Sequence, residues 1–177
     1  FTAADGLPDN IVQSVSFDRT NQNIVWLAFE NGCAGMFDLN THQYVSTYCG
    51  ELPVKQILAL EQEVWLAGNE AVIVLNRTGM QVKNKMTASG LLQMAADAEA
   101  NIWLLQNTSL KRTIGEQVET VITLEPGEAE SVHDLIVSKT GRYWVTTKSG
   151  VAFYENGAKG FVKRNITLPL HQNSEVT

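Results

Sequence analysis

The chain has 177 residues, of which 44% are hydrophobic, and a formal net charge of -6 at pH 7. This length and composition fit one globular domain with a sizeable core and exclude a disordered chain. The charges are scattered and form no basic stripe, which argues against nucleic acid as a partner. No apolar run approaches the roughly 18 residues of a membrane-spanning helix. Because the sequence begins at Phe1 without a Met, we expect any targeting segment or membrane helix to lie outside it.

The most informative feature is a repeat, marked by Trp26, Trp65, Trp103 and Trp144 at spacings of 39, 38 and 41 residues. Each tryptophan lies in a short apolar segment, with one such segment about ten residues before it and two after it. The segments are rich in β-branched and aromatic residues and are separated by turn residues such as Asn31-Gly32, which predicts strands. A helical solenoid has a similar period, but its repeat needs two helices of about ten or more residues, and these segments are too short.

We predict four strands in each repeat. In the first two repeats they span 11–17, 23–29, 34–39 and 44–48, then 57–60, 63–67, 71–75 and 81–86. In the last two repeats they span 91–96, 101–105, 109–113 and 117–124, then 132–137, 142–146, 151–154 and 160–164. A repeat of about 40 residues with four strands is typical of a β-propeller blade. The predicted fold is therefore all-β, a β-propeller segment of four blades with four antiparallel strands each, at approximately 1–50, 51–90, 91–130 and 131–170.

The tryptophan strands are apolar on both faces. Alternate residues of 24–29 point in opposite directions, and both sets are hydrophobic, so both faces need cover. An open stack of four such blades exposes one apolar face at each end, and each face is larger than a soluble monomer normally shows. We therefore expect the chain to be part of a larger propeller, with 171–177 beginning a further blade, or to associate with a second copy.

The first blade resembles the two-component regulator propeller repeat. The resemblance is carried by Phe1-Thr2, by Asp5-Gly6-Leu7-Pro8-Asp9-Asn10-Ile11-Val12, by Asp18 and by Val25-Trp26-Leu27-Ala28. The fourth blade keeps Gly141, Trp144 and Gly150-Val151; the third keeps Asp97 and Asn101-Ile102-Trp103 but lacks the glycine; and the second is short at its turn. A WD-repeat propeller fits less well, because no tryptophan is followed by Asp.

This resemblance implies a role as well as a fold. Repeats of this family form large periplasmic propellers of membrane receptors, whose cytoplasmic part is a histidine kinase or a GGDEF diguanylate cyclase, and they are commonly linked to carbohydrate sensing. We therefore expect an extracytoplasmic ligand-sensing segment, itself not an enzyme, that contacts the membrane only through segments outside this chain. The expected partners are a small molecule or oligosaccharide and the remaining blades of the same receptor or a second copy.

Two cysteines, Cys33 and Cys49, match no zinc-binding pattern. A hairpin between the third and fourth strands of the first blade, turning near residue 41, sets these cysteines almost opposite each other. A disulfide is then geometrically possible, subject to the usual limit on the Cα separation, and would close a loop of about 16 residues. It would indicate an oxidising compartment, whereas the alternative is a pair of unbonded thiols.

The candidate ligand-binding residues are polar residues in the loops that lead into the first strand or join the second strand to the third. In a propeller these loops share one end, and their amides and carboxylates suit sugar hydroxyls. The candidates are Asn10, Gln13, Asn31, Lys55, Gln56, Asn69, Gln93, Asn107, His133, Asp134 and Lys148.

No catalytic residues, metal ligands or cofactor are predicted. Ser131, His133 and Asp134 have the composition of a nucleophilic triad, but Ser131 and His133 share one face of the strand and Asp134 takes the other, so the three cannot converge. The alternatives to a sensor are a protein-interaction scaffold and a propeller enzyme of the streptogramin-lyase type, which needs a histidine-rich and acid-rich axial site. Three dispersed histidines argue against the lyase.

Overall fold

The computed structural model describes residues 1–115, 117–124, 132–138, 142–147, 150–157 and 160–166, which form four sheets of four strands and one short 3-10 helix. The first two sheets consist of β1 (Val12–Phe17), β2 (Ile24–Phe29), β3 (Cys33–Asp38) and β4 (Gln43–Cys49), then β5 (Gln56–Ala59), β6 (Glu63–Ala67), β7 (Ala71–Asn76) and β8 (Val82–Thr87). The last two consist of β9 (Leu91–Ala96), β10 (Ile102–Gln106), β11 (Ser109–Ile114) and β12 (Gln117–Thr123), then β13 (Val132–Val137), β14 (Tyr143–Thr147), β15 (Gly150–Gly157) and β16 (Gly160–Ile166). The predicted strands are confirmed, with ends that differ by at most three residues.

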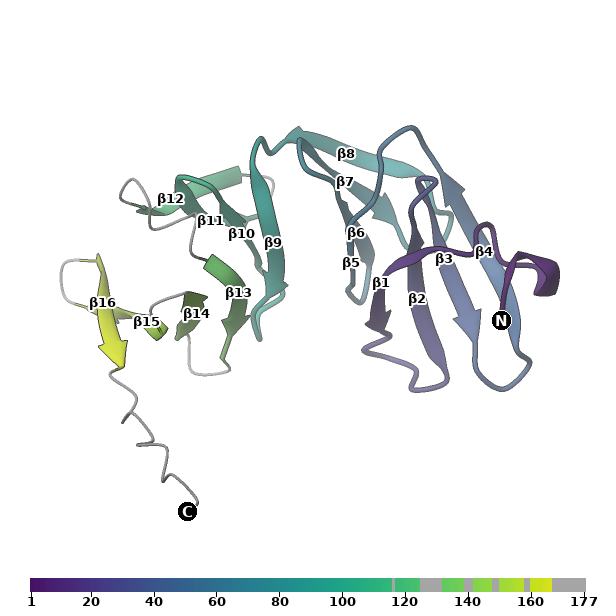
Figure 1. Ribbon diagram of the computed structural model, residues 1–177, viewed down its shortest axis with the longest axis horizontal. Helices are drawn as coiled ribbons and strands as arrows, with labels where there is room; N and C mark the ends of the chain where they lie inside the picture. Colours follow the sequence, from purple (N-terminus) through teal and green to yellow (C-terminus); the bar gives the residue numbers. More distant parts are fainter. Residues whose placement is uncertain (116, 125–131, 139–141, 148–149, 158–159, 167–177) are drawn as a thin grey trace, which may run out of the picture.

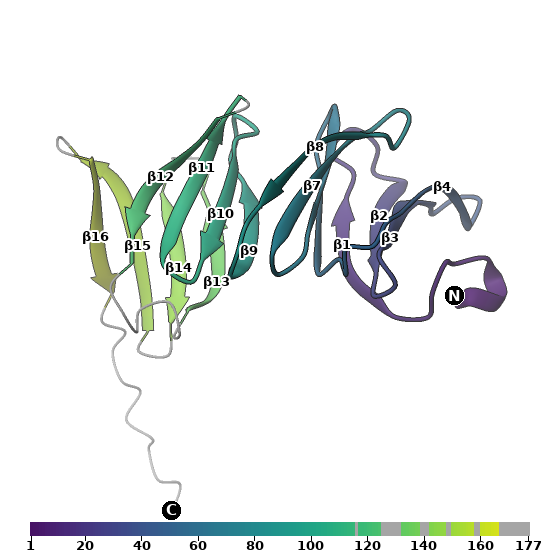
Figure 2. The same cartoon turned by 90° about the horizontal axis from the view of Figure 1, so that it is seen from above.

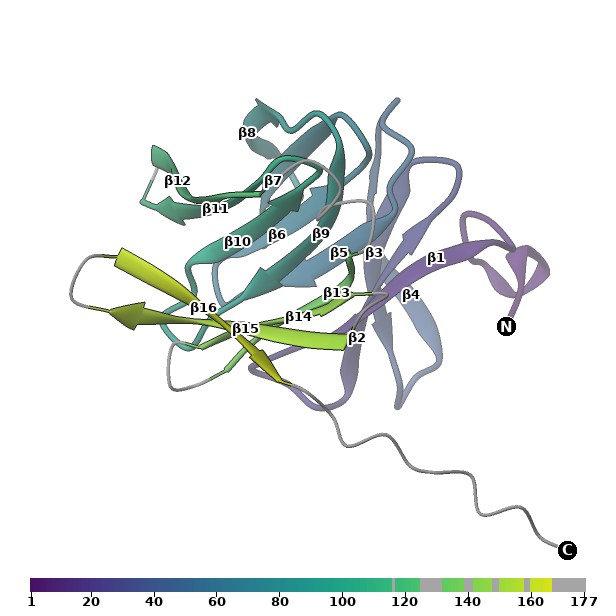
Figure 3. The ribbon, with the colours of Figure 1, turned by 60° about the vertical axis from the view of Figure 1, so that its left-hand side comes forward.

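The sheets are stacked as propeller blades. Within each sheet the four strands pair antiparallel in chain order, and the four sheets follow one another like slices (Figures 1 and 2). The first strands β1, β5, β9 and β13 contact one another from sheet to sheet. The fourth strands β8, β12 and β16 lie farther out than β5, β9 and β13 (Figure 3). This arrangement confirms the predicted fold class, and the sheets are called blades 1 to 4 below.

The core lies between the blades, because each middle strand is apolar on both faces. Three buried clusters fill the three interfaces, and each contains the tryptophan of the preceding blade. Trp26 and Trp103 are 0% exposed and Trp65 is 6% exposed. Each of these indoles therefore faces the next blade along the chain, which explains why the repeat places one tryptophan in every period.

A carboxylate in the turn after the first strand anchors the indole in two blades. Asp18 Oδ2 accepts a hydrogen bond of 2.8 Å from Nε1 of Trp26, and Asp97 Oδ2 accepts one of 2.9 Å from Nε1 of Trp103. The other oxygen of each carboxylate accepts backbone N–H groups of its own turn, including Thr20 N and Asn101 N. One side chain thus fixes both the turn and the tryptophan rotamer, and it satisfies an indole N–H that is buried.

Asp18 also joins blade 1 to blade 2. Arg77, in the turn between β7 and β8, donates from Nη2 to Asp18 Oδ2 at 2.5 Å, and the side chain of Asp18 is 0% exposed. Burial raises the pKa of Asp18, but hydrogen bonds from Trp26, Thr20 and Asn21 outweigh burial and lower the pKa to about 2. The carboxylate is therefore the form that the fold stabilises.

In the third interface an aromatic residue covers the indole. The rings of Trp103 and Tyr143 have centroids 3.7 Å apart, and burial raises the pKa of Tyr143 to about 12. The Arg112 guanidinium lies 5.2 Å from the Trp103 ring. The first and third interfaces are thus both closed over their tryptophans, by an arginine in one and a tyrosine in the other.

The two cysteines form a disulfide on β3 and β4. Cys33 and Cys49 are direct ladder partners, their Cα atoms lie 4.0 Å apart, and the bond closes a loop with a sequence separation of 16. The chain-entropy model assigns such a loop a stabilisation on the order of 3 kcal/mol. The same face of blade 1 is partly covered by the segment that precedes β1, whose Leu7 packs into a cluster with Leu27 and Phe29.

We predict that Asp18→Ala lowers the free energy of unfolding by about 3–5 kcal/mol, because it leaves the Trp26 N–H and the Arg77 guanidinium without their acceptor. Urea denaturation at pH 7 measures this loss. The matched control is Asp38→Ala, which removes a half-buried aspartate at the end of β3 that accepts from Asn40 N and Thr41 N in its own turn and should cost about 1 kcal/mol. Because the pKa of Asp18 is about 2 in the fold, its stabilisation is complete above about pH 4 and is lost as the pH falls through 2. A loss independent of pH, or equal to that of the control, would contradict the anchoring role.

Candidate functional site

At one end of the blades, the β2–β3, β6–β7 and β10–β11 loops, which carry Asn31, Asn69 and Asn107, meet the segments leading into the first strands. Backbone hydrogen bonds tie these segments together, from Glu30 N to Ile11 O and from Asn107 N to Gly90 O. Four of the predicted side chains are exposed at this end: Gln13, Lys55, Asn69 and Asn107. They form the part of the predicted surface that is accessible to a ligand.

Two other predicted residues hold the segment before β1. Asn10 Oδ1 accepts from Ala3 N at 2.7 Å, and Asn31 Nδ2 donates to Pro8 O at 3.0 Å. Asn31 Oδ1 also accepts from Cys33 N at 3.0 Å, next to the disulfide. Asn10 and Asn31 therefore have structural partners within blade 1.

Gln56 and Gln93 are clamps between blades. Gln56 Oε1 accepts from Met94 N at 2.6 Å and Gln56 Nε2 donates to Met94 O at 2.7 Å, so one amide pairs with the backbone of the next first strand. Gln93 Oε1 accepts from Leu135 N at 2.7 Å in the same way. In blade 1 the hydroxyls of Ser14 and Ser16 accept from Ile57 N and Ala59 N. These side chains satisfy the free edge of each first strand, where no fifth strand is available.

The remaining predicted residues are less completely placed. His133 and Asp134 lie in β13, and their side chains lie outside the described part, as do the whole of Lys148 and the segment 171–177. Gln13 and His133 occupy equivalent positions, because the register of each first strand shifts there, between Val12 and Ser14 and between Val132 and Asp134.

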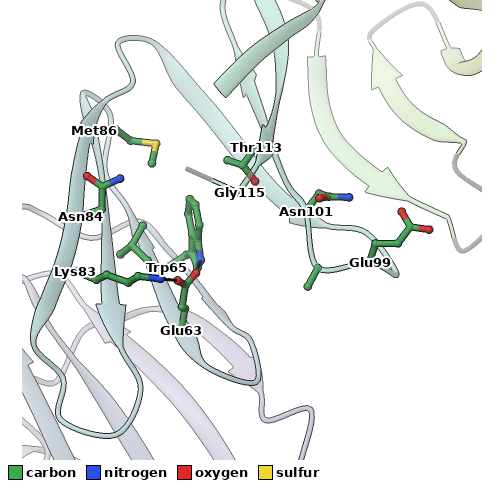
Figure 4. A pocket seen from close by; sticks show the side chains of 11 residues that line it. Glu63, Trp65, Lys83, Asn84, Met86, Glu99, Asn101, Thr113 and Gly115 are labelled. Atoms are coloured by element: carbon green, nitrogen blue, oxygen red, sulfur yellow. Dashed lines mark hydrogen bonds and ion pairs between the residues drawn. The ribbon is translucent and has the colours of Figure 1, made fainter. Parts of the chain in front are cut away.

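A pocket of about 500 Å³ lies at the opposite end of the stack, between blades 2 and 3. One wall comes from β6, β7 and β8, and the other from the β9–β10 turn and the end of β11 (Figure 4). The lining residues are Glu63, Trp65, Val74, Lys83, Asn84, Met86, Glu99, Ala100, Asn101, Thr113 and Gly115. This volume lies in the range of small-molecule sites. None of the lining residues was among the predicted ligand-binding residues.

Blade 2, which forms one wall of the pocket, lacks the turn aspartate. Leu60 occupies the position of this aspartate, because its N–H makes the equivalent backbone hydrogen bond, to Glu63 O. In blades 1 and 3, Asp18 N donates to Ile24 O and Asp97 N donates to Asn101 O. In each blade the accepting residue lies two residues before the tryptophan. The indole acceptor is instead Glu63, whose Oε2 lies 3.0 Å from Trp65 Nε1. The other oxygen of Glu63, Oε1, pairs with Lys83 Nζ at 2.5 Å (dashed in Figure 4). The carboxylate thus lies in the pocket wall and not in a closed turn.

Comparisons with known proteins agree on the fold. No family model and no curated relative matches the chain. Among similar solved structures, the extracellular domain assigned to a hybrid two-component system of B. thetaiotaomicron has a TM-score of 0.68 and 17% identity over 91% of this chain and 25% of that domain. The WD40 β-propeller domain of Doa1 has a TM-score of 0.70 and 12% identity, covering 86% of this chain and 53% of that one. For streptogramin B lyase the TM-score is 0.67 and the identity 10%, covering 90% and 56%.

These identities are low, so the comparisons show the fold alone: four blades of a β-propeller. The chain spans about half of the WD40 domain and of the lyase, and a quarter of the receptor domain. In the part of the chain that the structure describes, no helix is long and apolar enough to cross a membrane.

We predict that Gln56→Leu lowers the free energy of unfolding by about 1–3 kcal/mol, because it leaves the N–H and C=O of Met94 without partners at a similar side-chain size. Gln13→Leu is the matched control. Gln13 is exposed, so its replacement should change stability by less than about 0.5 kcal/mol. Chemical denaturation measures both variants. Equal effects of the two substitutions would show that Gln56 is not a clamp.

Proposed function

We propose that this chain is an extracytoplasmic, ligand-sensing β-propeller segment of a bacterial signal-transduction receptor, of the two-component sensor or diguanylate cyclase type. The repeat resemblance and the likeness to the extracellular receptor domain support this function. The observation that carries the proposal is the disulfide between Cys33 and Cys49. Disulfides persist in oxidising compartments, so this bond favours a periplasmic receptor over a cytoplasmic scaffold with the same fold.

We propose further that the ligand is a carbohydrate, bound at the loop end where Gln13, Lys55, Asn69 and Asn107 are exposed. An oligosaccharide offers rows of hydroxyl groups, and amides and an ammonium group supply matching donors and acceptors. We assign no enzymatic activity to this segment. The kinase or cyclase output belongs to other parts of the proposed receptor.

The first and last blades each leave apolar side chains uncovered. On the outer face of blade 1, Val15 is 55% and Phe17 is 74% exposed, beside the buried Val25 and Leu27. In blade 4 Trp144 is half-buried, whereas Trp26 and Trp103 are covered by a following blade. We propose that further blades of the same receptor, or a second copy, cover these faces. The exposed apolar side chains also favour the second candidate function, a protein-interaction scaffold.

The compartment can be tested on the full-length protein in intact cells of the native host. We expect a thiol-alkylating reagent added without reductant to leave Cys33 and Cys49 unmodified, and both to react after reduction and unfolding, as read by mass spectrometry. A receptor propeller folded in the periplasm retains its disulfide. Alkylation of both cysteines before reduction would overturn the extracytoplasmic placement.

Ligand sensing can be tested by a thermal-shift screen of oligosaccharides. We expect at least one to raise the melting temperature of the wild-type chain, because a ligand that binds only the folded state stabilises it. The double variant Lys55→Ala/Asn69→Ala should weaken the apparent affinity at least about tenfold, since it removes two of the exposed polar groups. Lys85→Ala, an exposed lysine on β8, serves as the control. If no sugar shifts the melting temperature while a protein partner binds, the scaffold function replaces this proposal.

A further inference from the structure

The first blade interface shows what kind of group fits beside a carboxylate and an indole in this stack. Arg77 crosses from blade 2 and places its guanidinium 5.8 Å from the Trp26 ring. Its Nη2 donates to Asp18 Oδ2 at 2.5 Å and to Thr20 Oγ1 at 3.1 Å, and its Nη1 donates to Leu60 O at 3.3 Å. A planar cation that lies on an indole and donates in several directions matches guanidinium geometry.

The second interface lacks this arginine. Trp65 is the strand-ladder partner of Val74 on β7, and Trp103 is the partner of Arg112 on β11. Arg77 lies three residues after Val74 and Gly115 lies three residues after Arg112, so the two positions are equivalent in blades 2 and 3. A Cβ added to Gly115 would meet nothing within 4 Å. Blade 3 therefore carries no side chain at the place from which Arg77 reaches back, and the space beside Trp65 stays open as the pocket of about 500 Å³.

The acceptors that such an arginine would meet are present in the pocket. Glu63 lies beside Trp65 and is the acceptor nearest its indole, whereas Glu99 and Asn101 line the facing wall with their side chains directed away from Trp65 (Figure 4). Among the described lining residues, the charged groups are two carboxylates and the ammonium of Lys83, so this part of the pocket favours a cation. Lys83 is 54% exposed in its side chain, and an exposed ion pair contributes little to stability, so Lys83 can move away from Glu63 at small cost.

We propose that the pocket between blades 2 and 3 binds a guanidinium group supplied from outside the chain, in the place that Arg77 fills in the first interface. The guanidinium lies against the Trp65 indole and donates to the Glu63 carboxylate, and Lys83 gives up its bond to Glu63. The group belongs either to a small molecule or to an arginine side chain of a polypeptide. This site is separate from the proposed carbohydrate surface at the other end of the stack.

The direct test is a titration of the ¹⁵N-labelled chain followed by NMR, with the indole N–H signal of Trp65 as the reporter. The probes are agmatine and a Gly-Arg-Gly peptide amide, with a Gly-Lys-Gly peptide amide and maltotriose as comparators. We expect both guanidinium probes to move the Trp65 signal in a saturable way and to leave the Trp26 signal unmoved, because Arg77 already occupies the first interface. Tighter binding of the peptide indicates a polypeptide source, and tighter binding of agmatine indicates a small molecule.

Two charge variants separate this proposal from other ligands. Glu63→Gln keeps an oxygen acceptor for the Trp65 N–H but removes the charge, and should weaken agmatine binding at least about tenfold. Lys83→Ala removes the competing cation and should strengthen agmatine binding by about threefold or more. Thermal melting checks that both variants fold. A pocket that uses Lys83 to bind a sugar or an anion would be weakened by Lys83→Ala, the opposite result.

A second pair of variants tests the comparison with Arg77. Gly115→Arg should abolish agmatine binding, because the chain then supplies its own guanidinium to Glu63. Gly115 has a φ of +59°, so any side chain there is strained, and Gly115→Ala carries the same strain without the charge and should retain binding. The proposal is overturned if neither guanidinium probe moves the Trp65 signal at 10 mM, on the order of the weakest small-molecule affinities. It is also overturned if the lysine peptide or maltotriose binds as well, or if Lys83→Ala weakens binding.

Discussion

Each of the three blade interfaces contains a buried indole whose N–H needs an acceptor. The tryptophans are central to the apolar clusters, so their removal from water stabilises the stack, but an unpaired N–H in that position would cancel part of the gain. Asp18 and Asp97 accept the indole hydrogen bond from the turn after the first strand, whereas Glu63 accepts it from the same strand that carries the tryptophan. Which solution a blade uses decides whether its interface is closed or open.

The fold could be predicted from the sequence because its signals are local and repeated. The spacing of the tryptophans predicted the length of each blade, and the apolar residues on both faces of each middle strand predicted that the blades stack face to face. The expected hairpin register predicted that Cys33 lies opposite Cys49. A departure from the repeat pattern leaves the turn unchanged: Ala100 stands where the repeat that the first blade resembles has glycine, and it still takes a left-handed φ of 64°.

The candidate site was harder to predict because it depends on what neighbouring blades do to each side chain. Gln56 and Gln93 were predicted to bind a ligand from the loops that lead into the first strands, but their amides hydrogen-bond to the free edge of the next first strand. The pocket depends on the lack of a side chain at Gly115. This lack can be recognised only when β7 and β11 are aligned on the residues that pair with their tryptophans, because the alignment makes Gly115 equivalent to Arg77. Two signals were present in the sequence, the short turn of blade 2 and the glycine after β11, but neither alone distinguishes a cavity from a tight turn.

The three differences at the second interface are physically linked. With Leu60 in place of the turn aspartate, the Trp65 N–H needs another acceptor, and Glu63 supplies it from a position facing the gap between blades. An arginine at position 115 would close that gap as Arg77 closes the first, but glycine leaves it open and Lys83 balances part of the charge from the same blade. A repeat protein can tolerate one open interface because the closed ones on either side hold the flanking blades in register. Where a repeated interface departs from its own pattern and remains satisfied, the departure marks the place where a ligand can replace a side chain.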